Sequence, residues 1–217
     1  MNLANNSSNS EDQVRTHDIP IADAMSEFMK TGWEAATDLT LSAHPSIAFT
    51  KARRDRLSKK YPGIRLIFPA GGLKVRSNDT DYPFRAHSDF AWLTGIIATD
   101  CVPDSVFVME PNTIGHEDLL FAHPRSSRDS EEFYKDTKYG EFWVGKRMSL
   151  SQTQSKYQLK VMQLELITQF LSDKKVALLI RGVDQRVDQL ITASDDREKE
   201  LLNTLSIMRM VKDQYEI

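Results

Sequence analysis

The chain has 217 residues, 40% of them hydrophobic, and a formal net charge of −3, which suits one large domain or two small ones with an apolar core. The small negative charge gives no electrostatic reason to expect binding to nucleic acid or to an anionic membrane. Cys101 is the only cysteine, so internal disulfides and thiolate zinc clusters are excluded, and a cytoplasmic location is the expectation. No apolar run approaches the roughly 20 residues that span a bilayer.

The N-terminal sequence MNLANNSSNSEDQ is polar and lacks the apolar core of a signal peptide, so residues 1–17 are expected to form a disordered or extended tail. A first helix is expected to begin near Asp18 or Pro20. Apolar residues then recur at helical spacing and define one face, made of Ile21, Ala24, Met25, Phe28, Met29 and Trp33. We expect this face to pack on the domain, because such stripes usually serve a core; a partner site is the alternative.

A second helix is predicted over residues 45–61, where Pro62-Gly63 ends it. Its basic residues are interpreted as a solvated face, made of Lys51, Arg53, Arg54, Arg56, Lys59 and Lys60. Short apolar runs predict strands at 64–69, 88–94, 105–109, 119–122 and 175–180, of which the third and fourth form a hairpin. Further helices are predicted at 128–134, 156–171 and 197–215, and the last of these directs Leu201, Leu205, Met208 and Val211 inward.

Residues 75–95, VRSNDTDYPFRAHSDFAWLTG, mix charges with aromatic side chains. Arg76 and Arg85 are interleaved with three acids, Asp79, Asp81 and Asp89. We expect a loop in which these charges pair with each other, leading into a half-buried strand. A purely structural turn held by salt bridges is the plain alternative to a functional loop.

Strands framed by helices predict a three-layer α/β/α fold with one domain over residues 18–217. The chain carries no self-contained active site that we recognise. Its five histidines make no metal-ligand pattern, and the adjacent residues 116–118 do not converge easily on an ion from a polar loop. No G-x-S-x-G elbow and no phosphate-binding loop is present.

Residues 76–95 resemble the N-terminal domain of the creatinase/prolidase/aminopeptidase P family, whose members read approximately R-S-x-D-x-x-Y-P-F/Y-R-x-x-S-D-F-x-Y/W-L/F-T-G. The positions that fit are Arg76, Ser77, Asp79, Tyr82, Pro83, Phe84, Arg85, Ser88, Asp89, Phe90, Trp92, Leu93, Thr94 and Gly95. Ala91 stands where the family often has an aromatic residue. The resemblance implies a mixed sheet with helices on both faces, similar to the ribonuclease H topology, and relatives among the Xaa-Pro aminopeptidases, which are M24B-type metallopeptidases.

A second motif, EFWVGKR at residues 141–147, resembles the family pattern E-x-W-x-G-x-R through Glu141, Trp143, Gly145 and Arg147. Residues 208–217 resemble the helix that connects to the family's catalytic domain. That domain has a pita-bread fold and binds two divalent metal ions, Mn²⁺ in our expectation, through two Asp, one His and two Glu. It would follow residue 217, so the resemblance implies a fragment or truncated product of a longer peptidase, with no catalytic residue, metal or cofactor of its own.

The resemblance implies that the longer protein removes the N-terminal residue from peptides with proline second. This domain would pack on its own catalytic domain, support a homo-oligomer and wall the substrate entrance, where Asp79 would pair with the substrate's ammonium group and Trp143 would cover the site. The structural motif residues carried over are Arg76, Tyr82, Arg85, Asp89, Trp92, Gly95 and Arg147.

Two alternatives remain open at the level of the sequence. One alternative is a protein- or peptide-binding module of an inactive family member, as in histone chaperones, and the other is a prolidase- or creatinase-like hydrolase. For the individual residues, Asp79 pairing with Arg76 or Arg85, and Trp143 anchoring a core, are structural readings of equal standing.

Overall fold

The computed structural model describes residues 22–34, 40–78 and 80–216. The chain divides into two compact units, one made of Met1–Ala35 with Ser126–Lys146 and the other of Ala36–Arg125 with Arg147–Ile217. The predicted tail at 1–17 and the predicted helix start at Asp18 or Pro20 lie outside the described residues, and the single domain over 18–217 stays a prediction.

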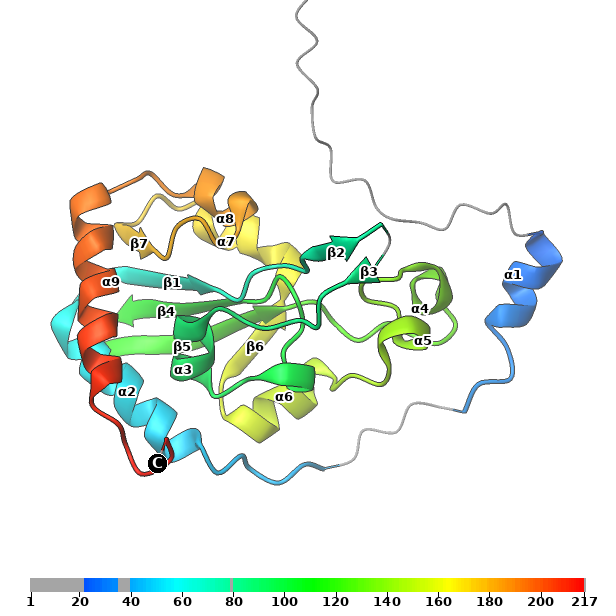
Figure 1. The fold of residues 1–217 in the computed structure, drawn as a ribbon, viewed down its shortest axis with the longest axis horizontal. Helices are drawn as coiled ribbons and strands as arrows, with labels where there is room; N and C mark the ends of the chain where they lie inside the picture. Colours follow the sequence, from blue (N-terminus) through cyan, green and yellow to red (C-terminus); the bar gives the residue numbers. More distant parts are fainter. Residues whose placement is uncertain (1–21, 35–39, 79, 217) are drawn as a thin grey trace, which may run out of the picture. The chain divides into compact units, whose positions relative to one another are not determined.

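The larger unit is built on a mixed sheet with the strand order β6-β5-β4-β1-β7. Strand β1 pairs antiparallel with β4 and parallel with β7, while β5 pairs antiparallel with β4 and parallel with β6. In Figure 1, β7, β1, β4 and β5 follow one another from top to bottom. The strands are β1 (Arg65–Pro69), β4 (Val106–Asn112), β5 (Gly115–Ala122), β6 (Lys160–Gln163) and β7 (Ala177–Leu179).

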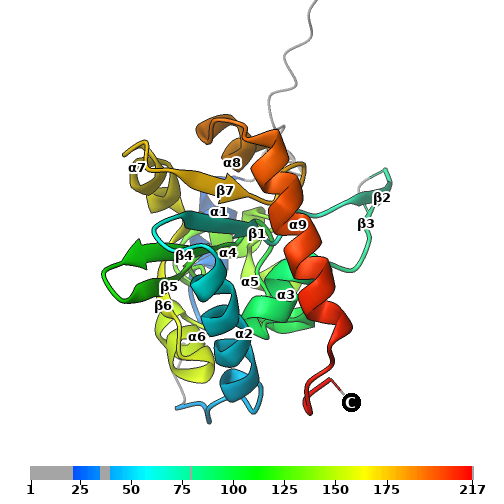
Figure 2. The ribbon, with the colours of Figure 1, turned by 90° about the vertical axis from the view of Figure 1, so that its left-hand side faces the viewer.

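Alternate side chains of these strands enter two separate apolar clusters, one on each face of the sheet. In β1, Leu66 and Phe68 belong to the first cluster and Ile67 to the second, as expected for a strand with a period of two. Helices α2, α3, α6 and α9 contribute to the first cluster, and α7 and α8 to the second. Figure 2 shows α2, α3 and α9 together beside the strands. This arrangement confirms the α/β architecture with helices on both faces. The helices are α2 (Ile47–Lys60), α3 (Ser88–Thr94), α6 (Leu150–Tyr157), α7 (Ile167–Leu171), α8 (Gln185–Leu190) and α9 (Asp195–Met210).

The predicted hairpin is confirmed as β4–β5, which pairs from Val106↔Phe121 to Asn112↔Gly115. The helices predicted at 45–61 and 197–215 correspond to α2 and α9, and the strands at 64–69 and 175–180 to β1 and β7. The prediction that Val211 faces inward is wrong, because Val211 lies beyond the end of α9 and is 63% exposed.

The predicted strand at 88–94 is wrong, because these residues form helix α3. The His87 side chain accepts a hydrogen bond from the Asp89 amide at the start, and Gly95 takes a left-handed φ of 75° at the end. An acidic first turn and a terminal glycine are the usual helix boundaries. The aromatic residues had favoured a strand, yet Phe90 and Leu93 lie three apart and are both buried, as one face of a helix requires.

The single helix predicted over 156–171 is also wrong. Helix α6 ends at Tyr157, Gln158 adopts a left-handed conformation, and β6 follows as a strand parallel to β5. A short 3-10 turn, Leu164–Leu166, then leads into α7. The start of α6 carries a capping box between Ser149 and Gln152, which is the sequence signature of a helix beginning before residue 156.

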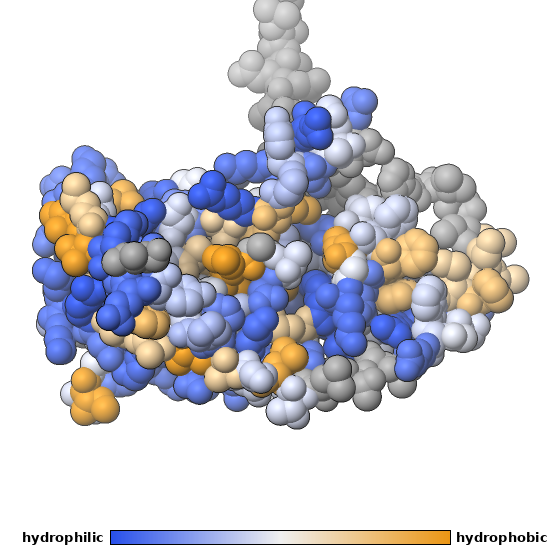
Figure 3. Space-filling view, turned by 60° about the horizontal axis from the view of Figure 1, so that its bottom comes forward, coloured by the Kyte–Doolittle hydropathy of each residue, from blue (hydrophilic) through white to orange (hydrophobic). Residues whose placement is uncertain are grey.

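The smaller unit consists of short helices, α1 (Asp23–Met29), α4 (Glu131–Lys135) and α5 (Glu141–Val144). The helix predicted at 128–134 corresponds to α4. The predicted packing of the apolar face is wrong for Met25 and Phe28, which are exposed, while Trp33 of the same face contacts Phe133. Ser26 is the buried residue of α1, and Ile21 lies outside the described residues. Hydrophobic side chains of α1 therefore remain on the surface. Figure 3 shows hydrophobic patches among hydrophilic side chains on one face of the molecule.

Candidate functional site

The first part of the family motif forms a small exposed hairpin rather than a closed loop. Strand β2 (Val75–Ser77) pairs antiparallel with β3 (Thr80–Asp81). Arg76 and Tyr82 are exposed on this hairpin. Asp79, the residue proposed to pair with a substrate ammonium group, lies outside the described residues, so its role stays a prediction.

The charge pairing predicted within residues 76–89 is wrong for Asp89. Its carboxylate accepts a hydrogen bond from Arg209 of α9 at 2.9 Å and lies 3.7 Å from the ring of His87. Asp89 is buried, whereas Arg76 and Arg85 are exposed. The buried carboxylate of Asp89 is therefore paired with a cation from α9, a helix that packs on the same face of the sheet.

Two buried arginines of α2 bind the carboxyl end of α3. Arg53 donates to the Trp92 carbonyl at 2.9 Å, and Arg54 donates to the Leu93 carbonyl at 2.7 Å. The last carbonyls of a helix have no intrahelical partner and carry its negative dipole end. The interpretation of the α2 cations as a solvated face is therefore wrong for these two residues. Their spacing with Leu57, also buried on α2, is the signal that identifies them as facing inward.

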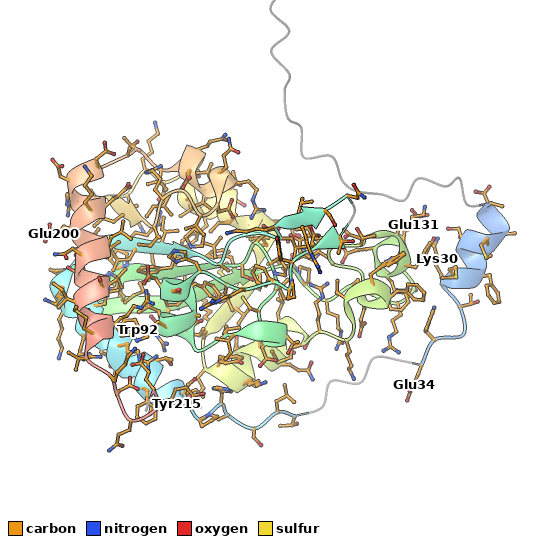
Figure 4. The ribbon with its side chains drawn as sticks, in the orientation of Figure 1. Lys30, Glu34, Trp92, Glu131, Glu200 and Tyr215 are labelled. Carbon is orange, nitrogen blue, oxygen red and sulfur yellow. The ribbon has the colours of Figure 1, made fainter. Side chains whose placement is uncertain are left out.

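The guanidinium groups of Arg53 and Arg54 also meet carboxylates from elsewhere in the chain. Arg53 contacts Asp213 at 2.6 Å and Glu216 at 3.4 Å, and Arg54 contacts Asp118 at 2.7 Å. Trp92 is buried, and the Arg53 guanidinium lies 5.1 Å from the centre of its ring. Figure 4 labels Trp92 and Tyr215, which mark α3 and the chain after α9. The end of α3 is thus tied to the C-terminal segment through one arginine.

Gly95 is required by its surroundings as well as by its backbone. A Cβ atom at this position would collide with Ser46 Oγ and lie 3.2 Å from Thr50 Cγ2. Its φ of 75° is also one that other residues adopt at a cost. The glycine of the motif therefore serves close packing of α3 against α2.

A polar cluster lies where α6 meets the 3-10 turn Ala98–Asp100. Asp100 accepts hydrogen bonds from Lys156 and from the Tyr157 hydroxyl, each at 2.5 Å. Burial opposes ionisation of Asp100, but these hydrogen bonds prevail and lower its pKa. Burial and the same carboxylate raise the pKa of Tyr157, and burial raises the pKa of Cys101 to about 12. A tyrosine and a thiol held neutral in this way are unsuited to act as nucleophiles at neutral pH.

Trp143 lies in α5 of the smaller unit. Its indole N–H donates to the Tyr134 carbonyl at 2.6 Å, and its side chain is 49% exposed. It is therefore neither a buried core anchor nor a free surface residue. Of the other second-motif residues, Glu141 is buried in the same unit, while Arg147 belongs to the larger unit and donates to the Pro124 carbonyl at 3.3 Å.

Within the described ranges, no group of three His, Cys, Asp or Glu side chains is arranged to hold a metal ion. None of the helices that the structure describes combines the length and the apolar character needed to cross a membrane. The family resemblance assigns the metal pair to the catalytic domain and not to this one, so we assign no metal-dependent step to the residues described here.

Comparisons with known sequences relate this chain to aminopeptidases. Residues 50–177 match the profile of the aminopeptidase P N-terminal domain. Xaa-Pro aminopeptidase 1 of Streptomyces coelicolor is 39% identical over 201 residues, which cover 91% of this chain and 40% of that protein. Xaa-Pro aminopeptidase 2 of the same organism is 34% identical over 196 residues, covering 89% of this chain and 41% of that protein. The chain thus spans about two fifths of the length of these relatives.

Solved structures agree on the fold. Proline aminopeptidase P II from Yersinia pestis superposes with a TM-score of 0.58 at 23% identity, covering 77% of this chain and 40% of that one. Aminopeptidase P from E. coli with the inhibitor Pro-Leu gives a TM-score of 0.54 at 22% identity, covering 76% and 34%. Since the profile match takes in more than half of the residues, the chain belongs to the aminopeptidase P N-terminal domain family.

Proposed function

We propose that this chain is the non-catalytic N-terminal part of a Xaa-Pro aminopeptidase that removes the N-terminal residue from peptides with proline second. The observation that carries the proposal is the similarity to two Streptomyces Xaa-Pro aminopeptidases along most of the chain. The bond in question needs a dedicated enzyme, because the proline nitrogen has no N–H and its ring fixes φ near −65°. Two divalent metal ions, Mn²⁺ in our proposal, would be bound outside the described residues and supply the activated water.

The share of this domain in the reaction is to shape access to the substrate. Trp143 supports this role because its indole is both held by the Tyr134 carbonyl and half exposed. A fixed aromatic surface can cover a peptide while losing little conformational entropy. Asp79, as the partner of the substrate ammonium group, completes the proposal.

The domain also offers surface for packing on its catalytic domain and on other copies in a homo-oligomer. Ile207, Met210 and Val211, at and beyond the end of α9, are all more than half exposed. Apolar side chains gathered at one place on a surface often mark an interface. Cytoplasmic location is part of the same proposal.

The test of the access role uses the full-length protein and Xaa-Pro peptides of increasing length. Trp143→Ala is expected to change the ratio of kcat/KM for long over short peptides by about three- to tenfold, as one aromatic contact would. Val144→Ala, which trims the neighbouring exposed side chain, is the matched control and should leave the ratio unchanged. Equal ratios in both variants and the parent would refute the access role.

A second measurement concerns Asp79. Asp79→Asn is expected to lower kcat/KM by about ten- to a hundredfold, the range for losing a hydrogen bond to a charged group. The melting temperature and the bound metal should stay unchanged, since the residue is proposed to contact the substrate alone. The 217-residue chain by itself should show no turnover with added Mn²⁺, and turnover there would overturn the non-catalytic assignment.

A further inference from the structure

Residues 22–34 lie outside the segment that matches the family profile, which begins at residue 50. The structure nevertheless places them in one compact unit with residues 126–146, the segment that carries Trp143. The question is therefore what residues 22–34 contribute to the segment that carries Trp143.

Side chains of the extension contact α4 and α5 directly. Ser26, the buried residue of α1, is hydrogen-bonded through its hydroxyl to the hydroxyl of Tyr134, which is also buried. The Trp33 ring lies edge-on to Phe133 at 4.9 Å and to Phe142 at 6.2 Å between centroids. Edge-to-face pairs of this kind stabilise beyond the area that they bury. The extension thus contacts α4 at Phe133 and Tyr134, and it contacts α5 at Phe142.

The backbone of the extension also engages a charged pair of the same unit. Arg128 donates through Nη1 to the Glu34 carbonyl, and its Nη2 lies 3.8 Å from the Glu141 carboxylate. Glu141 is buried, and within the described part of the chain neither of its carboxylate oxygens has a hydrogen-bond partner. The guanidinium that lies near this carboxylate is therefore held in place by residue 34. Figure 4 labels Lys30 and Glu34 on the extension and Glu131 on α4, and the Lys30–Glu131 pair at 4.0 Å adds a weak, exposed contact.

Tyr134 connects these contacts to the proposed entrance residue. Its hydroxyl is bonded to Ser26 of the extension, and its carbonyl accepts the indole N–H of Trp143 at 2.6 Å. The same residue therefore joins α1 on one side and Trp143 on the other.

We propose that residues 22–34 are a clasp that orders α4 and α5 and thereby positions Trp143, with Ser26 and Trp33 as positioning residues. The clasp is a property of this chain's own fold. Its consequence for peptide selection rests on the proposed function of Trp143.

Hydrogen exchange of the 217-residue chain tests the clasp without any activity. Trp33→Ala is expected to speed exchange of amides in 131–144 by about tenfold, because two ring contacts are lost from a locally stabilised unit. Deleting residues 1–34 should speed it further. Amides of β1 and β4, which belong to the other compact unit, should exchange at unchanged rates. Phe28→Ala is the matched control, since this aromatic residue lies on α1 and is 70% exposed.

The hydroxyl pair gives an independent test of coupling. Ser26→Ala and Tyr134→Phe should each speed exchange of the Trp143 amide, and the double variant should do no more than either alone, as for two partners of one bond. Unchanged rates in 131–144 after deletion of residues 1–34 would overturn the clasp. In the full-length protein, a deletion that speeds exchange but leaves peptide-length preference intact would keep the clasp and count against the entrance role of Trp143 alone.

Discussion

Helices α3 and α5 share a tryptophan followed by a glycine, but one tryptophan is buried and the other is half exposed. Both carry a tryptophan shortly before a glycine with positive φ, Gly95 at 75° and Gly145 at 81°. Trp92 is 7% exposed and Trp143 is 49% exposed. A Cβ at Gly95 would meet Ser46 and Thr50, whereas a Cβ at Gly145 would meet nothing within 4 Å. An aromatic-and-glycine motif thus marks where a short helix ends, but the partners brought by other helices decide whether it is a buried anchor or an exposed surface.

The largest expected effect comes from removing the cation that anchors α3. Arg53→Met should lower the free energy of unfolding by about 3–5 kcal/mol, because a buried charge network loses one partner and a helix-end carbonyl loses its donor. Chemical denaturation followed by far-ultraviolet circular dichroism measures this. Lys51→Met, which removes an exposed cation of the same helix, is the control and should cost under about 0.5 kcal/mol. Equal losses in the two variants would contradict the anchor.

The glycine comparison can be sharpened next. Gly95→Ala should cost about 2–4 kcal/mol, which adds overpacking against Ser46 to the cost of a left-handed alanine. Gly63→Ala, also at positive φ and with nothing within 4 Å of the added carbon, should cost only the backbone part, about 1–2 kcal/mol. Thermal melts of both variants measure the difference. If the two costs were alike, close packing at Gly95 would not matter.

A pH experiment tests the cluster that surrounds α6. The folded-state pKa of Asp100 lies below its ordinary value of 3.8, so its contribution to stability is present above that pH and is lost as the pH falls through the lowered pKa. Asp100→Asn should cost about 1.5–3 kcal/mol at pH 7, the range for hydrogen bonds to a charged group, and the difference from the parent should shrink below pH 3.8. A difference that stayed constant down to pH 2 would show that the carboxylate charge is not involved.

The smallest expected effect is at the exposed arginine of the first motif. Arg85→Ala should change the free energy of unfolding by less than about 0.5 kcal/mol, because the side chain is exposed. The expectation from sequence was that Arg85 pairs with the acids of residues 79–89 and holds the loop in shape. A loss of several kcal/mol in denaturant titrations would restore that expectation.

The elements predicted correctly from sequence are those whose apolar pattern is set locally. Strands β1, β4, β5 and β7 are short apolar runs between turn residues, and α2 and α9 are long and periodic. The predictions for α3 and β6 were wrong because both elements are short and their conformation depends on other contacts. The cap at His87 starts α3, and pairing with β5 makes β6 a strand.

The sites divide in a similar way. The sequence motifs drew attention to residues 88–95 and to Trp143, but they did not reveal the helix at 88–94 or which charges would meet. Asp89 is bound by Arg209, 120 residues away in the chain. Arg53 and Arg54 were set aside as surface cations, although the spacing of Arg53, Arg54 and Leu57 on α2 already identified an inward face. Partners brought together by folding cannot be read from neighbouring residues.

The contacts of Arg53 carry a consequence for how this sequence can change over evolution. One guanidinium serves the Trp92 carbonyl and the carboxylates of Asp213 and Glu216. A lysine has a single ammonium group without the planar fork, so it could not reach all three. Substitutions at positions 53, 213 and 216 are therefore expected to occur together among homologues. Homologues that lack Arg53 but keep one of the two carboxylates should be rarer than homologues in which Arg53, Asp213 and Glu216 are all replaced.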